Sequence, residues 1–370
     1  MIKVLQVISA LHRHGTETAV MNLYKNINRQ DIQFDFLVFS DQDMDYLEEI
    51  NSLGGKVYII PGRRNGFIRY IKEVRSFFKK NSNEYNIVHL NFCYISTLIP
   101  YLYAWKYQIP KRISHSHSSN YVGGWYNLFL HKIFKPFAAI LSTDYLACSD
   151  LAGKWFFENT IAENHYIILP NGIDTSKFSF NPIFRLKTRK ELGITNELVL
   201  GHIGYFTPVK NHIFLIRIFE HILHHISFAK LLLIGSGGDL ELETKQYVIQ
   251  KGLDKKIIFL GKRSDISFLL QAIDVFVLPS LFEGLPLSLI EAQAVGLKVF
   301  TSDTVSQETK ITDNISFLPL SAGAETWANH ILSKIPYERE EQKDNIYSAG
   351  FSIEYSVEEL TKLYKNTTVL

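Results

Sequence analysis

The sequence predicts an α/β protein of two domains, each built on a doubly wound parallel sheet. Its 370 residues exceed what one ordinary hydrophobic core organises. Short apolar runs alternate with helical patterns along most of the chain, as expected for parallel strands joined by helices. The alternation stops at the turn signal Asn171-Gly172-Ile173-Asp174 and then restarts. We therefore expect two domains that face each other across a cleft, with ligands at the carboxyl ends of the strands.

The first domain is expected to span residues 1–172. Its short apolar runs favour strands, and its longer amphipathic segments favour helices. The expected strands are 4–8, 34–39, 56–60, 87–90, 112–115, 145–148 and 166–169, and the expected helices are 16–27, 46–50, 67–78, 97–105 and 125–137.

The second domain is expected to span residues 173–345, followed by a last segment at 346–370. It should open with an irregular stretch that runs to Lys187. The same patterns then predict strands at 198–203, 230–234, 257–260, 275–278, 298–301 and 316–319, and helices at 211–226, 240–249, 287–295 and 356–364.

Composition excludes several classes of protein. A hydrophobic content of 46% is typical of a folded chain, and a net charge of +2 gives no basis for binding nucleic acid. Cys93 and Cys148 are far apart, so we expect neither a disulfide nor a thiolate metal site, which suits a reducing cytosol. The N-terminus is interpreted as a first strand and not as a signal peptide. No apolar run approaches the ~18 residues that a membrane span needs, which favours a soluble or peripherally bound protein.

The stretch from Glu283 to Glu291, E-G-L-P-L-S-L-I-E, carries the strongest indication of a ligand site. Pro286 suits the first position of a helix, which would leave Glu283 on the preceding loop and place Glu291 inside the helix. N–H groups after Gly284 would then point toward a phosphate. A nucleotide sugar fits, with sugar hydroxyls at Glu283, diphosphate at the helix N-terminus and ribose hydroxyls at Glu291. The alternative interpretation is that Glu291 is an ion-paired helix residue and that Glu283 is a charge on a surface loop.

Three other strand-to-helix loops are expected to face the cleft. The loop at Gly15 could contact phosphate or an acceptor, or Thr16 could be an ordinary N-cap. Lys210, on the loop that starts at Gly204, could neutralise a leaving diphosphate, although single lysines are usually only solvated. The Gly-Ser-Gly-Gly turn at 235–238 would allow a ligand to approach the backbone closely.

His115 and His117 end a strand of the first domain. Their separation would suit metal ligation, but no acidic or thiolate companion lies nearby, so we expect no metal site. A neutral His117 that donates to a sugar hydroxyl or carbonyl is the preferred interpretation. A buried structural histidine is the alternative, more so for His115.

Two segments combine basic and apolar residues at helical spacing. Residues 63–80 carry seven Lys or Arg opposed by one Glu, and residues 125–137 combine five aromatic residues with two lysines. Such helices can lie against anionic lipid. A core-facing helix with a basic outer face explains the same pattern, so both interpretations stay open.

Taken together, these motifs resemble the retaining glycosyltransferases of family four, which have the GT-B fold. The Glu, seven residues, Glu pattern at 283–291 is similar to that family's signature. Other motifs follow in the family's order, namely Gly15-Thr16-Glu17, His117, P-N-G-I-D at 170–174, Lys210 and I-G-S-G at 234–237. The resemblance implies two facing Rossmann-like domains, with the nucleotide held mainly by the second. It also implies that the last segment, 346–370, crosses back as a helix onto the first domain.

The resemblance further implies roles for individual residues. Glu283 would contact the donor sugar, Lys210 the leaving diphosphate, and His117 the transferred sugar, while Glu291 would hold the ribose. The implied donor site comprises Gly15, Gly204, Lys210, Gly235, Gly237, Glu283, Gly284, Leu285, Pro286 and Glu291. The implied reaction uses no metal or other cofactor and keeps the anomeric configuration, because the acceptor attacks from the leaving group's side and the leaving phosphate takes its proton.

Two positions depart from the family pattern. Tyr205 stands where the family usually has Arg, so one of two cations at the leaving diphosphate is absent. His14-Gly15 stands where the family often has Gly-Gly, which bears on the acceptor side.

We therefore expect a cytoplasmic enzyme, peripheral on the inner face of the membrane. It would move a hexosyl or N-acetylhexosaminyl group from a nucleotide diphosphate, UDP favoured, to a lipid-linked oligosaccharide in capsule or exopolysaccharide synthesis. Segments 63–80 and 125–137 would contact the membrane. The alternatives are a non-catalytic GT-B partner of another transferase, motivated by Tyr205, and a nucleotide-sugar epimerase of the same fold. A nicotinamide dehydrogenase is disfavoured, because no G-x-G-x-x-G follows the first strand.

Overall fold

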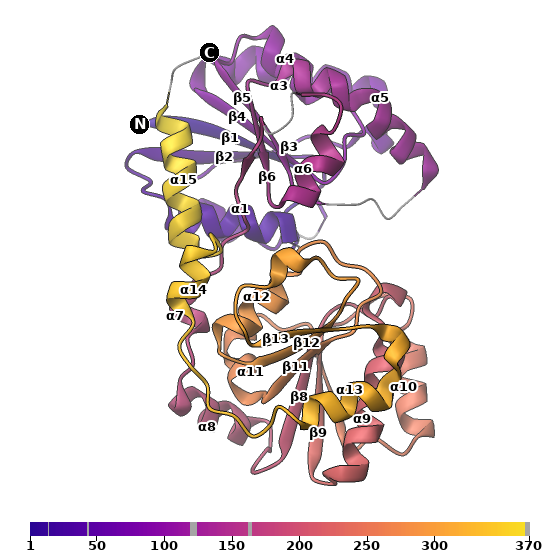
Figure 1. Ribbon diagram of the computed structural model, residues 1–370. Coiled ribbons are helices and arrows are strands. Elements are labelled where there is room, and N and C mark those ends of the chain that lie inside the picture. The colour runs from indigo at the N-terminus through magenta and orange to yellow at the C-terminus, as the bar shows by residue number, and fades with distance from the viewer. Residues whose placement is uncertain (14, 43, 119–123, 162–164, 367–370) are drawn as a thin grey trace. The chain divides into compact units, whose positions relative to one another are not determined.

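The computed structural model describes residues 1–13, 15–42, 44–118, 124–161 and 165–366. The chain forms two compact units, each with its own sheet (Figure 1). Each unit also has its own hydrophobic cores. The first unit consists of Met1–Gly172 together with Ile353–Leu370, and the second consists of Ile173–Ser352.

The first unit is built on a parallel sheet whose described strands run in the order β3-β2-β1-β4-β5-β6-β7. The order reverses between β1 and β4, which is the switch point where open α/β sheets commonly bind ligands. Its elements are β1 (Ile2–Ile8), α1 (Gly15–Asn26), β2 (Ile32–Val38), α2 (Leu47–Ser52), β3 (Val57–Ile59), α3 (Phe67–Asn81), β4 (Ile87–Phe92), α4 (Ile99–Lys106), β5 (Lys111–Ser116), α5 (Trp125–Leu141), β6 (Asp144–Ala147), α6 (Asp150–Phe157), β7 (Ile167–Ile168) and α15 (Ile353–Lys365).

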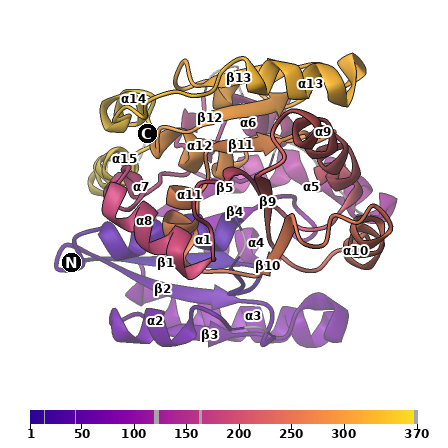
Figure 2. The same ribbon diagram turned by 90° about the horizontal axis from the view of Figure 1, so that it is seen from below.

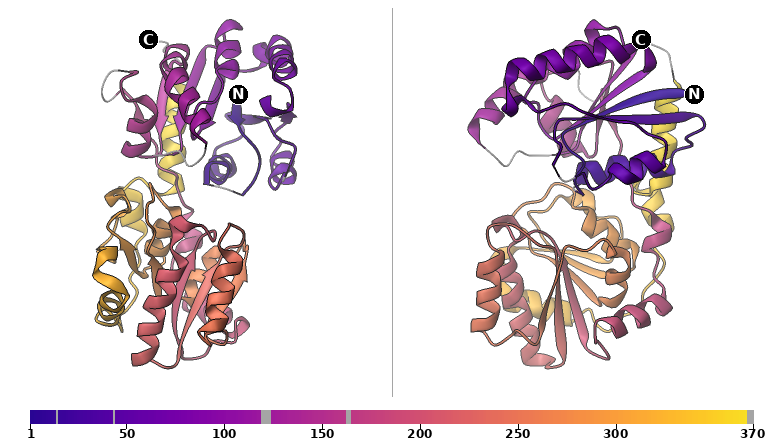
Figure 3. Two further views of the ribbon diagram at one scale, coloured as in Figure 1. Left: turned by 90° about the vertical axis from the view of Figure 1, so that its right-hand side faces the viewer. Right: turned by 180° about the vertical axis from the view of Figure 1, so that it is seen from behind.

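Side chains alternate along each strand, and this alternation separates two cores. On β1, Leu5 and Val7 belong to the core that α3, α4, α5 and α6 cover. Val4 and Ile8 belong to the core on the other face, which α1, α2 and α15 cover. Helix α15, yellow in Figure 3, therefore completes one face of a sheet that begins at the other end of the chain.

The second unit repeats this plan with described strands in the order β10-β9-β8-β11-β12-β13. Helices α9, α10 and α13 share one core, and α11 and α12 share the core on the other face (Figure 2). Its elements are α7 (Thr175–Phe178), α8 (Pro182–Glu191), β8 (Leu198–Ile203), α9 (His212–His225), β9 (Ala229–Ile234), α10 (Glu241–Gln250), β10 (Ile257–Gly261), α11 (Ile266–Ala272), β11 (Val275–Leu278), α12 (Leu287–Ala294), β12 (Lys298–Ser302), β13 (Ile315–Leu318), α13 (Gly323–Leu332) and α14 (Lys343–Ser348).

The expected α/β class with two doubly wound parallel sheets is confirmed, but two local predictions are wrong. The stretch to Lys187 is not irregular, because α7 and α8 form there. Asn181 caps α8 by accepting from the N–H groups of Ile183 and Phe184, and Pro182 occupies the first turn. Pro286 is the residue before α12 and not its first residue, with an extended ψ of 113°.

Candidate functional site

The loops after β8, β9 and β11 carry most of the predicted donor-site residues of the second unit. These strands are neighbours in the sheet, in the order β9-β8-β11. Gly204 follows β8, Gly235 follows β9, and Glu283 lies on the loop after β11. Because parallel strands end at one edge of a sheet, the fold brings these distant segments together.

Lys210 and Glu283 form an ion pair at this edge, with 2.6 Å between Nζ and Oε1. Both side chains are largely buried, at 17% and 19% exposure. Ser280 donates a further hydrogen bond from Oγ to Oε1 of Glu283, at 3.2 Å. The carbonyl of Glu283 accepts from the N–H of Ser306, at 3.3 Å, which holds the loop against the segment after β12. One cation and one carboxylate are thus kept side by side, each neutralising the other.

The two glycine loops pack backbone against backbone. A Cβ on Gly204 would lie 3.0 Å from Cδ and Cε of Lys210, so the lysine stem lies directly over that backbone. Gly235 has a φ of +139°, and a Cβ there would collide with the carbonyl oxygen of Gly204. The N–H of Phe206 donates to the carbonyl of Gly237, at 2.8 Å. This packing is sufficient to explain the glycines at 204 and 235, so donor contact at Gly204, Gly235 and Gly237 stays a prediction.

Tyr205, the departure from the family pattern, is exposed beside these loops. Its side chain is 44% accessible, and a Cβ on Gly237 would lie 3.8 Å from its ring. Tyrosine adds no positive charge here, so Lys210 is the one cation that the 204–211 loop provides.

Glu291 is the fifth residue of α12, and its carboxylate has no hydrogen bond or ion pair with any residue that the structure describes. The side chain is half-buried, and loss of contact with solvent raises the pKa of this carboxyl to about 8. A carboxylate in such a place costs free energy unless a partner compensates it. The hydroxyl groups of a ligand could provide those missing hydrogen bonds.

The turn between the two glutamates offers main-chain donors. Within the described chain, the N–H groups of Gly284 and Leu285 have no hydrogen-bond acceptor. Helix α12 begins at Leu287, directly after Pro286, so the positive end of its dipole lies at this turn. N–H groups of this kind are a ready site for phosphate oxygens.

In the first unit, Gly15 is the first residue of α1 and is exposed. A Cβ on Gly15 would meet nothing within 4 Å, so packing does not require glycine there. Thr16 lies inside the helix, so its alternative role as N-cap is wrong, and its Oγ1 lies 3.5 Å from Sγ of Cys93. His14, the other residue of this predicted motif, falls outside the described residues.

His117 is held by a chain of buried side chains that leads to α15. Its Nε2 lies 3.0 Å from Oδ1 of Asn91, whose Nδ2 donates to Oε1 of Gln6, at 2.8 Å. Nε2 of Gln6 donates in turn to the hydroxyl of Tyr364, at 3.1 Å. The same hydroxyl lies 2.6 Å from Nδ1 of His89. Period-two alternation along β1 and β4 places Gln6, His89 and Asn91 on one face of the sheet.

These contacts fix where the protons lie. Both hydrogens of the Asn91 amide are used, toward Gln6 and the carbonyl of His89, so its oxygen must accept from Nε2–H of His117. His117 then keeps Nδ1 as an acceptor. Burial lowers the pKa of His117 to about 4, and the side chain of Asn171 opposes this lowering, so the ring is neutral at pH 7. Burial also lowers the pKa of His89 to about 3.

His115 continues the same network and is buried, which fits the structural alternative for this residue. Its Nδ1 lies 3.1 Å from Nε2 of His89, and its ring lies 4.0 Å from that of His117. No group of three or more His, Cys, Asp or Glu side chains in the described ranges is arranged to hold a metal ion.

The sequence analysis missed Gln6, Asn91 and Tyr364, and it assigned no role to Asn171. The signal that could have found the first two is a polar residue inside an otherwise apolar strand, since Gln6 and Asn91 are 1% and 2% exposed. Tyr364 is separated from Gln6 by nearly the whole chain, and no local pattern connects them.

Across the part of the chain that the structure describes, no helix is both long enough and apolar enough to cross a lipid bilayer.

Two family models match the chain in succession. "Glycosyltransferase Family 4" matches residues 13–177, and "Glycosyl transferases group 1" matches residues 184–349. A putative glycosyltransferase, EpsF of Bacillus subtilis (strain 168), is 33% identical over 380 residues, covering 99% of this chain and 97% of EpsF. The capsular polysaccharide biosynthesis glycosyltransferase CapH of Staphylococcus aureus is 24% identical and covers the whole of both chains.

A third relative matches a shorter region. The Escherichia coli UDP-Gal:alpha-D-GlcNAc-diphosphoundecaprenol alpha-1,3-galactosyltransferase is 35% identical over 141 residues, which is 37% of this chain and 36% of that enzyme. Among solved structures, Anabaena HepE in complex with UDP and glucose has a TM-score of 0.74 at 17% identity, covering 98% of this chain and 99% of HepE. The likeness to HepE shows the shared fold.

Proposed function

This chain belongs to the family 4 glycosyltransferases and has their GT-B fold, and we propose that it transfers a hexosyl or N-acetylhexosaminyl group from a UDP-sugar with retention of anomeric configuration. It is a glycosyltransferase of bacterial capsule or exopolysaccharide synthesis, and its relative CapH is named for capsular polysaccharide biosynthesis. The observation that carries the finer proposal is the Lys210–Glu283 ion pair, which lies one short turn before a helix whose Glu291 carboxyl group has no partner among the described residues.

Binding of the donor exchanges the partners of this ion pair. Glu283 turns from Lys210 to the hydroxyl groups of the sugar, and Lys210 turns to the diphosphate. The N–H groups of Gly284 and Leu285 receive phosphate oxygens, and Glu291 accepts hydrogen bonds from the ribose hydroxyls. Each of these side chains and N–H groups thereby gains a hydrogen-bond or charged partner from the donor.

The reaction then needs no nucleophile from the protein. The acceptor hydroxyl attacks the anomeric carbon from the side of the leaving group, while the bond from that carbon to the diphosphate oxygen breaks. The departing phosphate oxygen takes the proton of the acceptor hydroxyl, so atoms and charge balance. Lys210 stabilises the charge that develops on the diphosphate, and we propose that no metal ion takes part.

His117 orients the transferred sugar as an acceptor of hydrogen bonds. Its Nε2–H is committed to Asn91, and its Nδ1 is buried without a hydrogen-bond partner among the described residues. In this proposal Nδ1 receives a sugar hydroxyl once the donor enters. The sequence analysis gave His117 the role of donor, and the orientation of Asn91 supports the opposite direction. Gly15, at the start of α1, stays a proposed neighbour of the donor phosphate.

The acceptor that we propose is a sugar carried on a lipid diphosphate. The Escherichia coli relative is named for such an acceptor and for a UDP-sugar. An enzyme with these substrates would work on the cytoplasmic face of the membrane, where segments 63–80 and 125–137 could contact lipid.

A transfer assay tests this function. The purified protein is incubated with UDP-glucose, UDP-galactose or their N-acetyl derivatives and a GlcNAc-diphosphate lipid, with and without EDTA. We expect one UDP-sugar to yield product that retains the donor's anomeric configuration, by nuclear magnetic resonance, and equal yield in EDTA. An inverted product, or an EDTA-sensitive rate restored by a divalent metal, would contradict the mechanism.

Tyr205 favours a second candidate, a non-catalytic partner that binds the donor but leaves turnover to another transferase. Turnover of any donor by the purified protein alone excludes this candidate. A nucleotide-sugar epimerase would instead convert the donor in the absence of acceptor, which the same assay detects.

A further inference from the structure

A pocket with a volume of about 1000 Å³ opens in the first unit, where the start of α3, the loop after β4 and the first half of α5 meet. This volume lies at the upper end for small-molecule sites and far exceeds what a lone phosphate fills. None of its lining residues has a role in the proposed donor site.

One side of the pocket is basic. Arg63 and Arg64 form a short 3-10 turn before α3, and Nη2 of Arg63 donates to Oδ1 of Asn127, at 2.6 Å. Among the described residues that line the pocket there is no Asp or Glu. Neither arginine pairs with a described carboxylate, whereas nearby Arg69 pairs with Glu73, at 2.6 Å. Two uncompensated guanidinium groups suit phosphate oxygens, which they can bind in a bidentate manner.

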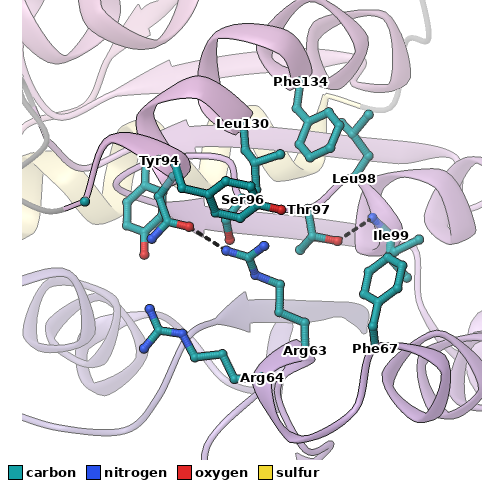
Figure 4. A pocket seen from close by; sticks show the side chains of 13 residues that line it. Arg63, Arg64, Phe67, Tyr94, Ser96, Thr97, Leu98, Ile99, Leu130 and Phe134 are labelled. Atoms are coloured by element: carbon teal, nitrogen blue, oxygen red, sulfur yellow. Dashed lines mark hydrogen bonds between the residues drawn. The ribbon is translucent and has the colours of Figure 1, made fainter.

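The other side of the pocket is apolar. Figure 4 shows the arginines on the side of Tyr94 and Ser96, and Phe67, Leu98 and Phe134 on the opposite side. Such a division fits an amphiphile whose head is anionic and whose tail is hydrocarbon.

Helix α5 continues this apolar surface outward. Trp125, Phe129, Ile133, Phe137 and Ile140 follow one another at intervals of four, four, four and three residues, which places them on one helix face. All five are between 41% and 78% exposed. They adjoin Phe134, which lines the pocket on the same helix. An exposed stripe with Trp and Phe, flanked by lysines, is typical of a helix that lies in a lipid surface.

We propose that this pocket binds the phosphate groups and the first part of the hydrocarbon chain of a lipid-linked acceptor, while α5 lies in the membrane surface. The nature of the acceptor rests on the proposed function. The pocket wall formed by residues 94–99 follows directly on β4, and the N–H of His117 donates to the carbonyl of Phe92 at the end of that strand, at 3.2 Å. A sugar on the bound phosphate would therefore begin beside the strand end that holds His117.

Binding of farnesyl diphosphate to the full chain, measured by calorimetry in saturating UDP, tests the pocket. We expect farnesyl diphosphate to bind at least tenfold more tightly than inorganic diphosphate or farnesol. The double variant Arg63→Gln/Arg64→Gln should weaken this binding at least tenfold. Lys79→Gln/Lys80→Gln removes the same charge from the other end of α3 and should change binding less than twofold.

An equal loss of farnesyl diphosphate affinity in the two double variants would overturn the proposal, because it would show that the net charge of the protein alone attracts the ligand. Equal affinities for inorganic diphosphate and farnesyl diphosphate would also overturn the proposal, because the hydrocarbon part of the ligand would then contribute nothing to binding. Unchanged melting and UDP-sugar binding in Arg63→Gln/Arg64→Gln would show that the variant is folded. If farnesyl diphosphate binding depends on the two arginines but the protein binds no UDP-sugar, the proposal for the pocket is supported and the proposed function is refuted.

Discussion

The two units carry their candidate residues in different ways. In the second unit, Glu283 and Glu291 lie in one short stretch, and Lys210 joins Glu283 from the loop after β8. In the first unit, His117 depends on Asn91, Gln6 and Tyr364, which come from three separate elements and both ends of the chain. The first arrangement is local and charged, and the second is dispersed, neutral and buried.

This difference separates what sequence can predict from what it cannot. A local charged stretch can be recognised in the sequence, because a few neighbouring residues determine the loop geometry and the start of the helix. A buried network leaves only isolated polar residues in apolar strands, whose partners depend on the register of the whole sheet. Sequence can therefore indicate candidate donor residues, whose roles stay predictions, but it cannot indicate the residues that support His117.

The largest expected effect comes from breaking the ion pair of the second unit. Lys210→Met should lower kcat by roughly 10²–10³-fold, because the developing charge on the diphosphate loses its cation. Glu283→Gln should lower kcat/KM strongly, since its sugar contacts weaken. Steady-state rates with the preferred UDP-sugar measure both.

Lys251→Met is the matched control, since it removes a surface ion pair with Glu220 (3.2 Å) in the same unit. Its rate should stay within twofold of the wild type. A Lys210→Met enzyme of normal kcat would show that the pair is only structural.

The next effect is the pH dependence that Glu291 imposes on stability. Its pKa is raised to about 8 in the folded protein from an ordinary 4.5, so the carboxyl is neutral at pH 7 when folded and ionised when unfolded. The associated stability is fully present below pH 4.5 and is lost as the pH rises through 8. Between pH 5 and pH 9, wild type should lose about 2 kcal/mol more stability than Glu291→Gln, a value reduced for solvent contact.

Urea unfolding at several pH values measures this difference. The exposed Glu243→Gln on α10 is the control and should follow the wild-type curve. Parallel curves for wild type and Glu291→Gln would refute an uncompensated buried carboxyl at this position.

A smaller effect is expected from the network of the first unit. Tyr364→Phe removes the hydroxyl that contacts both Gln6 and His89, which should destabilise the protein by about 1–2 kcal/mol. It should also lower kcat a few-fold with little change in KM for the donor. The variant loses a hydroxyl group that helps to hold the His117 ring in position, but His117 can still contact the sugar.

Tyr107→Phe serves as the control, since the Tyr107 hydroxyl has no hydrogen bond to another residue that the structure describes. Loss of stability without any change in kcat would confine the network to a structural role.

The smallest expected effect is an increase in kcat. Tyr205→Arg supplies a second cation beside Lys210, and we expect kcat to rise about threefold, which corresponds to well under 1.4 kcal/mol. The exposure of Tyr205 leaves room for the longer side chain. Single-turnover rates measure the change, and a slower Tyr205→Arg enzyme would show that the tyrosine itself contacts substrate.

The sequence predicted every described strand, because apolar runs and turn residues alternate regularly. It missed six of the described helices, namely α6, α7, α8, α11, α13 and α14. The signal for α8 is the cap Asn181 followed by Pro182, and the signal for α6 is the cap Ser149.

In the candidate site, the sequence predicted that Lys210 and Glu283 share a site, and their contact places them together. It could not predict that they neutralise each other, since this depends on loop packing around Gly204 and Gly235. The roles assigned to these residues, and to Gly15 and His117, stay predictions.

Nucleotide binding tests the central claim most directly, namely that the second unit holds a UDP-sugar through the loop at Glu283 and the carboxyl group of Glu291. Thermal melting of the purified protein is measured with UDP-, GDP- and ADP-linked sugars, for wild type, Glu291→Ala and the control Glu243→Ala. We expect UDP-sugars alone to raise the melting temperature, with the shift lost in Glu291→Ala and kept in Glu243→Ala. No shift with any nucleotide sugar, or an undiminished shift in Glu291→Ala, would contradict the account.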